Sequence, residues 1–130
     1  MPHFSRVSLA RLGTCDLRLQ RVAFEVIKRV DFSVVCGHRD EADQEAAYVG
    51  GFSKVRWPYS RHNDQPSEAL DFWPYPRPTP GEVVEARRFA YVAGLFVGVA
   101  HEMGIELQWG GVIWLPRFLD MLHIQLRRLA

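Results

Sequence analysis

The sequence predicts an α+β fold, in which a small antiparallel sheet packs against helices that include one long central helix. Short β-branched runs are mixed with longer segments of helical periodicity, and the two kinds do not alternate regularly as they do in parallel α/β proteins. The chain has 130 residues, the length of one ordinary domain. We therefore expect residues 1–130 to form a single domain.

The first half of the chain contains two predicted helices with a strand between them. Apolar residues recur at helical spacing over 16–30, and either Thr14 or Asp16 is suited to cap the start of this helix. The run FSVVC at 32–36 is rich in β-branched residues and is typical of a strand. A second helix is expected over 40–48, because an aspartate opens the segment and two glycines follow it.

The second half contains three predicted strands. Residues 52–68 form a polar, irregular stretch with two prolines, and long loops inside domains are usually functional or mobile. The segment ALDFW at 69–73 follows and is predicted to be a strand. Two further strands, at 105–109 and 121–126, complete the small sheet.

A long helix is predicted between these strands. Thr79 is suited to cap it, Pro80 to stand in its first turn, and Gly104 to end it after Met103. Residues 89–99 are apolar on most sides, which indicates that this helix is central to the core.

The composition excludes several classes of protein. The net charge is +1, which gives no electrostatic indication of nucleic-acid binding. The N-terminus lacks the apolar run of a secretory signal, and the longest apolar stretch, at 89–100, is too short to span a bilayer. The two cysteines, Cys15 and Cys36, are expected to be reduced thiols buried as small apolar side chains.

An aspartate in the middle of the 69–73 strand is the first indication of function. Burying an unpaired carboxylate costs several kcal/mol, so Asp71 needs a compensating cation. Side chains alternate between the faces of a strand, which places Asp71 and His123 on faces opposite the Leu, Phe and Ile of their strands. The two can converge on one side of the sheet, and His62 in the preceding loop can reach them.

Two imidazoles and one carboxylate suit zinc, at ligand distances of ~2.0–2.2 Å. Three protein ligands leave a fourth position for water, which is the catalytic rather than the structural arrangement. Asp120 lies three residues before His123 and is placed to take a proton from water and return it to a leaving amine. The pattern predicts a hydrolase with one Zn²⁺ per chain.

Five segments occur in the order expected of one enzyme family: CGHRDEADQEAAY, FSKVRWP, SRHNDQPSEALDFWPYP, WGG and DMLH. Together they resemble the phage L-alanyl-D-glutamate endopeptidase endolysins, which belong to the same zinc-peptidase superfamily as the D-alanyl-D-alanine carboxypeptidases. The similarity runs from about Leu12 to Leu126. It implies that His62, Asp71 and His123 are the zinc ligands and that Asp120 is the general base.

The resemblance adds three further candidates. It implies that Arg39 steadies the scissile carbonyl or a substrate carboxylate, and that Gln44 and Ser60 line the peptide-binding groove. A guanidinium is a permanent charge, which independently suits Arg39 to a developing oxyanion.

The sequence departs from these relatives after WGG, where they often carry polar and acidic residues. The segment VIWLPRF at 112–118 is apolar instead. It either fills the core, alters the reach of the substrate site, or contacts a membrane or partner.

The resemblance implies a monomeric zinc endopeptidase that cleaves the L-alanyl-D-glutamate bond of peptidoglycan stem peptides and lyses the bacterial host. Without a signal peptide or stable membrane insertion, it would wait in the host cytoplasm for a holin and then act on the cell wall. No separate wall-binding domain is expected in residues 1–130. Two alternatives remain: a D-alanyl-D-alanine carboxypeptidase on the same scaffold, and a non-catalytic zinc-stabilised binding module.

Overall fold

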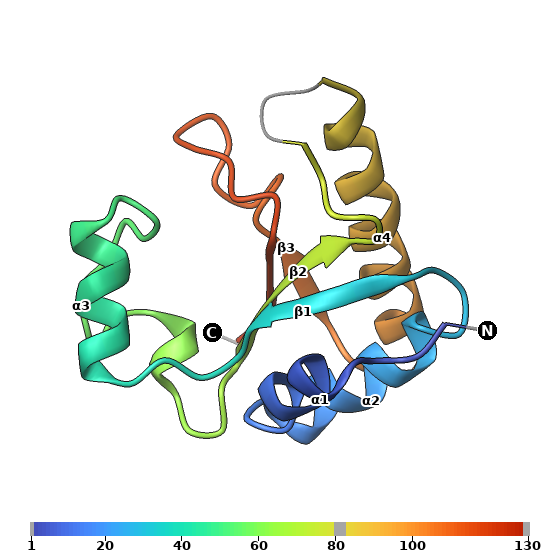
Figure 1. The fold of residues 1–130 in the computed structure, drawn as a ribbon, viewed down its shortest axis with the longest axis horizontal. Helices are drawn as coiled ribbons and strands as arrows, with labels where there is room; N and C mark the ends of the chain where they lie inside the picture. Colours follow the sequence, from blue (N-terminus) through green and yellow to red (C-terminus); the bar gives the residue numbers. More distant parts are fainter. Residues whose placement is uncertain (1, 80–82, 129–130) are drawn as a thin grey trace.

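Four antiparallel strands form the sheet at the centre of the molecule (Figure 1). The computed structural model describes residues 2–79 and 83–128. The strands lie in the order β1-β2-β4-β3, with these bounds: β1 Phe32–Cys36, β2 Ala69–Pro74, β3 Leu107–Trp109 and β4 His123–Leu126. The predicted α+β class is confirmed.

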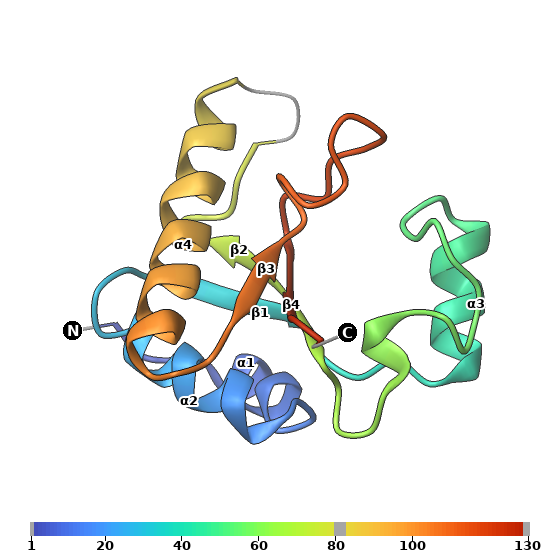
Figure 2. The same cartoon turned by 180° about the vertical axis from the view of Figure 1, so that it is seen from behind.

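Four α-helices and one 3₁₀ helix surround the sheet: α1 Arg6–Leu12, α2 Leu17–Val26, α3 Glu41–Val49, η1 Arg61–Asn63 and α4 Val83–Glu102. Helices α2 and α4 pack on each other, while α1 packs on β1 and α4 on β2 and β3. Helix α3 stands apart from them, at the opposite end of the molecule from α4 (Figures 1 and 2). No helix of the described part of the chain combines the length and apolar character that a membrane span requires.

The core lies between the sheet and α2 and α4, as the strand pattern predicts. Leu70 and Phe72 of β2 and Ile124 of β4 have no exposed surface. The Phe72 ring packs 5.7 Å from the ring of Phe96 on α4. Because α4 contributes a run of such buried residues, its predicted central position is confirmed.

The helices differ from the sequence prediction in two ways: one ends earlier than predicted, and one was not predicted. The 16–30 helix ends at Val26, because the chain must turn there to enter β1 at Phe32. Its N-cap is Asp16, whose side chain accepts from the backbone N–H of Arg18. Helix α1 is not predicted at all: it buries only Ser8 and Leu12, so its apolar periodicity is weak.

The remaining elements agree closely with expectation. Asp40 caps α3, and Gly104 lies just beyond α4 with a φ of 75°, in the left-handed region that favours glycine. The two C-terminal strands are confirmed but start two residues later than predicted. Pro80, predicted in the first turn of the long helix, lies outside the described residues.

Candidate metal centre

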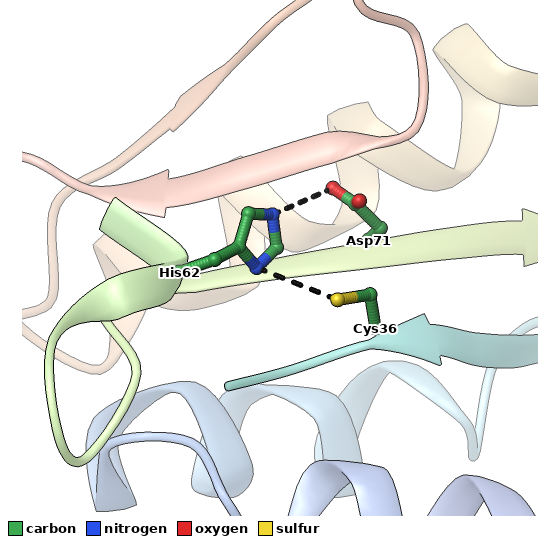
Figure 3. A group of neighbouring side chains, drawn as sticks. All are labelled: Cys36, His62 and Asp71. Carbon is green, nitrogen blue, oxygen red and sulfur yellow. Dashed lines mark hydrogen bonds and ion pairs between the residues drawn. The ribbon is translucent and has the colours of Figure 1, made fainter. Parts of the chain in front are cut away.

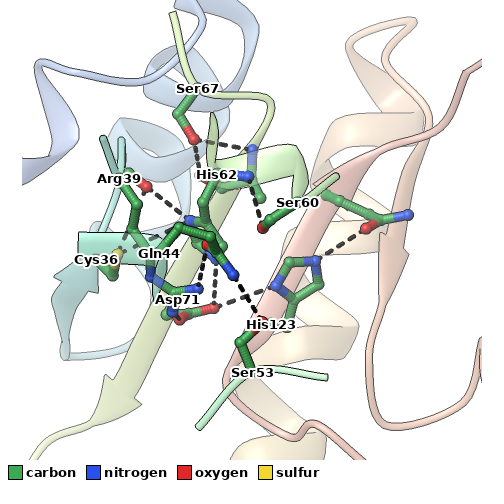
Figure 4. Close-up of polar contacts among 12 residues, drawn as sticks. Cys36, Arg39, Gln44, Ser53, Ser60, His62, Ser67, Asp71 and His123 are labelled. Carbon is green, nitrogen blue, oxygen red and sulfur yellow. Dashed lines mark hydrogen bonds and ion pairs between the residues drawn. The ribbon is translucent and has the colours of Figure 1, made fainter. Parts of the chain in front are cut away.

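Three elements bring the predicted ligands together. Asp71 lies directly opposite His123 in the register of the β2–β4 pair, and η1 carries His62 over the sheet. The Nε2 atom of His62 lies 3.2 Å, and the Nδ1 atom of His123 3.3 Å, from the same carboxylate oxygen, Oδ1 of Asp71 (Figure 4). The predicted convergence on one side of the sheet is confirmed.

The outer nitrogen of each imidazole is held by an oxygen. His62 Nδ1 lies 2.6 Å from the carbonyl oxygen of Gly37, and His123 Nε2 lies 2.9 Å from Oε1 of Gln125. Since these oxygens only accept hydrogen bonds, both outer nitrogens carry a proton. With both outer N–H groups held in this way, the inner nitrogens can offer their lone pairs to a cation that lies between them and Asp71.

Burial strengthens this requirement. The exposed fractions of His62, Asp71 and His123 are 2%, 8% and 6%. Burial disfavours the charged forms of both His62 and Asp71. Attraction to the Asp71 carboxylate nevertheless raises the pKa of His62 to about 10. The charge of His62, with close contacts from both imidazoles, holds the pKa of the Asp71 carboxyl well below its usual range despite its burial. A proton on His62 thus occupies the place that a metal ion would take.

Cys36 also lies beside this centre, although the pattern of the sequence does not point to it. It pairs across the sheet with Asp71 at a bulge in β1, and its Sγ lies 3.9 Å from His62 Nδ1 (Figure 3). Donor atoms of Cys36, His62 and Asp71 all lie within 4.8 Å of one another, close enough to form a metal-binding group. One feature of the sequence could have indicated Cys36: it begins the CGHR segment, which also contains Arg39. Cys15 is buried as expected, whereas Cys36 is only half-buried, so the prediction is wrong for Cys36.

Arg39 contacts the other oxygen of Asp71. Its Nη2 donates to Asp71 Oδ2 at 3.2 Å, and its Nη1 donates to Oε1 of Gln44 at 3.3 Å. Gln44 is fully buried, and its Nε2 donates to Ser53 Oγ and to the Val55 carbonyl, both at 2.8 Å. Gln44 therefore lies behind Arg39 and orients it.

Ser60 caps η1 in front of the ligand. Its Oγ accepts from the backbone N–H of His62 at 3.2 Å, and its own N–H donates to Oδ1 of Asn63 at 3.0 Å. The half-buried hydroxyl thus helps to hold the turn that presents His62. Contact of Gln44 and Ser60 with a substrate stays a prediction.

Asp120 lies at the edge of the centre. Its backbone N–H donates to the Gly110 carbonyl at 3.0 Å, which anchors the segment before β4. Burial, and next the charge of Asp71, raise the pKa of the Asp120 carboxyl above its usual range, against the opposing pull of His123, His62 and Arg39. A raised pKa brings a carboxyl closer to the range in which it can both accept and return a proton.

Gly110 allows this anchoring. A Cβ there would lie 3.1 Å from the Cβ atoms of both Asp120 and His123 and would collide with the Asp120 carbonyl oxygen. We expect Gly110→Ala to lower turnover at least tenfold, because it displaces two site residues together. The matched control is Gly98→Ala in α4, whose Cβ would meet nothing within 4 Å. This control should retain activity and gain ~0.5–1 kcal/mol of stability. Equal activities of the two variants would contradict the role of Gly110 in placing Asp120 and His123.

The apolar 112–118 segment lies on the surface beside the centre. Val112 and Leu115 are 53% and 55% exposed, so core filling does not explain them. The Trp114 ring lies 5.3 Å from the His123 ring and stacks on Phe118 at 4.9 Å. The segment therefore adjoins the proposed ligand His123.

Comparison with known proteins identifies the family. The sequence model of the phage L-alanyl-D-glutamate peptidases matches residues 1–116, a span that includes Arg39, His62 and Asp71. The crystal structure of Serratia marcescens L-Ala D-Glu endopeptidase ChiX is similar, with 28% identity and a TM-score of 0.74. The alignment covers 97% of this chain and 91% of that one. No curated protein matches the sequence significantly. The chain belongs to the phage L-alanyl-D-glutamate peptidase family.

Proposed function

We propose that this protein is a zinc-dependent endopeptidase that hydrolyses the L-alanyl-D-glutamate bond of peptidoglycan stem peptides. The observation that carries the proposal is the convergence of two imidazole nitrogens on one buried carboxylate oxygen, in a chain of this peptidase family. In this proposal His62, Asp71 and His123 hold one zinc ion. Bound there, zinc would polarise the scissile carbonyl and lower the pKa of the attacking water.

The His62–Asp71–His123 set is favoured over one that contains Cys36. Cys36 faces Nδ1 of His62, whose proton is donated to the Gly37 carbonyl at 2.6 Å. Binding a metal between Cys36 and that nitrogen would break this buried hydrogen bond, at a cost of roughly 1–3 kcal/mol. The Nε2 side of His62 needs no such change, because its lone pair already faces Asp71 and His123.

A spectroscopic experiment distinguishes the two donor sets. We expect Cys36→Ser to bind one metal ion per chain with unchanged affinity. The cobalt-loaded wild-type protein should lack the near-ultraviolet sulfur-to-cobalt charge-transfer band. Cys15→Ala, which removes the other thiol, serves as the control. A charge-transfer band that disappears only in Cys36→Ser would make Cys36 a ligand.

The side chains of this chain then have distinct tasks. Asp120 accepts a proton from the attacking water and returns it to the amine of the departing D-glutamate. Arg39 keeps Asp71 in place through Oδ2 and contributes a permanent positive charge next to the reacting carbonyl. Gln44 orients Arg39, and Ser60 holds the turn that carries His62.

Replacing Arg39 by alanine should lower turnover by roughly 10²–10³, as for loss of an oxyanion-stabilising donor. Because Arg39 also donates to Asp71, we expect zinc binding to weaken as well. Arg39→Lys should restore part of the zinc affinity but little turnover, since an ammonium cannot bridge Asp71 and Gln44 as the guanidinium does. Steady-state kinetics and zinc competition with a chelator measure the two effects. Full turnover in Arg39→Ala would remove Arg39 from the mechanism.

The activity is tested on defined substrates. Purified protein should contain about one zinc per chain and should cleave muropeptides between L-alanine and D-glutamate, as determined by product mass. A chelator should stop cleavage, and added zinc should restore it. Release of terminal D-alanine instead would identify a carboxypeptidase. Stoichiometric zinc without cleavage of any stem-peptide bond would identify a binding module.

We also propose that the enzyme acts as a monomer and reaches the wall only after a holin opens the inner membrane. Expression in a Gram-negative host should then cause lysis only together with a pore-forming protein. Gel filtration with light scattering measures the oligomeric state. Lysis by the enzyme alone would contradict the need for a holin.

A further inference from the structure

We infer that Gln125 is a positioning residue of the metal centre: it selects the His123 tautomer whose Nδ1 faces Asp71, and Gln108 in turn orients Gln125. The inference deepens the proposed function and rests on it, because zinc at this centre is itself part of that proposal. Neither glutamine is among the candidates that the sequence pattern indicated.

The first step is the contact between His123 and Gln125. The two residues are separated by one position on β4, so their side chains lie on the same face of the sheet. Oε1 of Gln125 lies 2.9 Å from Nε2 of His123. An amide oxygen only accepts, so Nε2 carries a proton, and in the neutral ring Nδ1 keeps its lone pair. That lone pair is the one directed at Asp71 Oδ1.

The second step is the orientation of the Gln125 amide. A glutamine that turned its NH₂ toward His123 would favour the opposite tautomer, with the lone pair on Nε2. Gln108 opposes this turn, because its Oε1 accepts from Gln125 Nε2 at 3.0 Å. Gln108 lies directly opposite Gln125 in the β3–β4 register. Two hydrogen bonds therefore connect Gln108, Gln125 and His123 across strands β3 and β4, and we call this connected set the relay.

The third step is the surroundings of the relay. Gln125 is only 7% exposed, so water has little access to replace either hydrogen bond. Its cross-strand neighbour on β2 is Ala69, a small residue that leaves the space above the sheet to the amide. Losing either partner would leave a polar atom unpaired in this buried place, which disfavours the change.

The relay parallels the contact that holds the other imidazole. His62 donates its outer N–H to the Gly37 carbonyl, and His123 donates its own to the Gln125 amide. Both acceptors are neutral and add no charge behind the imidazoles. Asp71 is the one anionic group in the proposed ligand set. Outer contacts of this kind fix the ring orientation of metal-binding histidines, and their loss typically weakens metal affinity by ~10–100-fold.

Four variants test the inference. Gln125→Leu removes the acceptor, and Gln125→Glu keeps an oxygen for Nε2–H. Gln108→Leu removes the acceptor that holds the side-chain amide of Gln125 in its orientation. The matched control is Gln20→Leu, the same change at a half-buried glutamine of α2 that donates to the Cys15 carbonyl. Zinc affinity is measured by competition with a chelator. The His123 tautomer is read from ¹⁵N NMR of the ring, with and without zinc, at a pH where the ring is neutral.

We expect Gln125→Leu to bind zinc ~10–100-fold more weakly than the wild-type protein. Gln125→Glu should restore affinity to the wild-type range, and Gln20→Leu should not change it. Gln108→Leu should show a smaller loss, together with a mixed His123 tautomer. A merely structural role for Gln125 would lower stability without changing the tautomer.

Two results would overturn the inference: wild-type zinc affinity in Gln125→Leu, or zinc bound through Nε2 of His123. If Gln125→Leu does not fold, an unchanged wild-type tautomer of His123 in Gln108→Leu overturns it instead. A wild-type protein that binds no zinc would contradict the proposed function alone. The relay would then be decided by comparing the His123 tautomer of the metal-free wild type with that of Gln108→Leu: a difference supports the relay, and equal tautomers overturn it.

Discussion

Replacing His123 by alanine is expected to abolish zinc binding and peptidase activity together. His123 supplies one of the two nitrogens that face Asp71 Oδ1. With only two protein ligands left, the affinity for zinc should collapse. Asp71→Ala should have the same effect, because the carboxylate is the point on which both imidazoles converge. Metal analysis of the purified variants, beside their rates of stem-peptide cleavage, measures both losses.

His101→Ala is the control for the loss of an imidazole. Its side chain is 71% exposed and pairs with Glu106 at 2.7 Å, so we expect zinc content and activity to stay at wild-type values. If His123→Ala kept its zinc at full stoichiometry while Cys36→Ser lost it, the metal would be held by Cys36, His62 and Asp71 instead.

Asp120→Asn is expected to separate catalysis from metal binding. Asparagine keeps the size of the side chain but cannot take a proton from the attacking water. The variant should fold, bind zinc and bind peptide, while turnover falls by roughly 10²–10⁴, as for removal of a general base. Kinetics on a defined stem peptide, with zinc content measured on the same sample, test this. The experiment is informative because the family match ends at residue 116, before Asp120.

Asp64→Asn is the matched control. This carboxylate lies 2.7 Å from Arg128 on the surface, and its loss should change turnover little. If Asp120→Asn lost zinc as completely as His123→Ala, Asp120 would be a ligand or would support one. Full turnover in Asp120→Asn would mean that another group is the base.

Much of this protein could be predicted from its sequence by local rules. The alternation along β2 and β4 separates the core residues from Asp71 and His123, because successive side chains point to opposite faces of a strand. The carboxylate between apolar neighbours indicates a cation, because an unpaired buried charge is too costly. Caps such as Asp40 and stops such as Gly104 act within one turn of chain, so they too are visible in the sequence.

Other features depend on strand pairing and packing, and only the tertiary structure decides them. Cys36 joins the centre because β1 pairs with β2 at a bulge, and Gln108 reaches Gln125 because β3 lies beside β4. Gln44 lies behind Arg39 because α3 packs its amide against the 53–55 loop. These contacts join residues 5 to 35 positions apart in the chain. Local periodicity carries no information on such pairings, because they are set by which strands become neighbours and in which register.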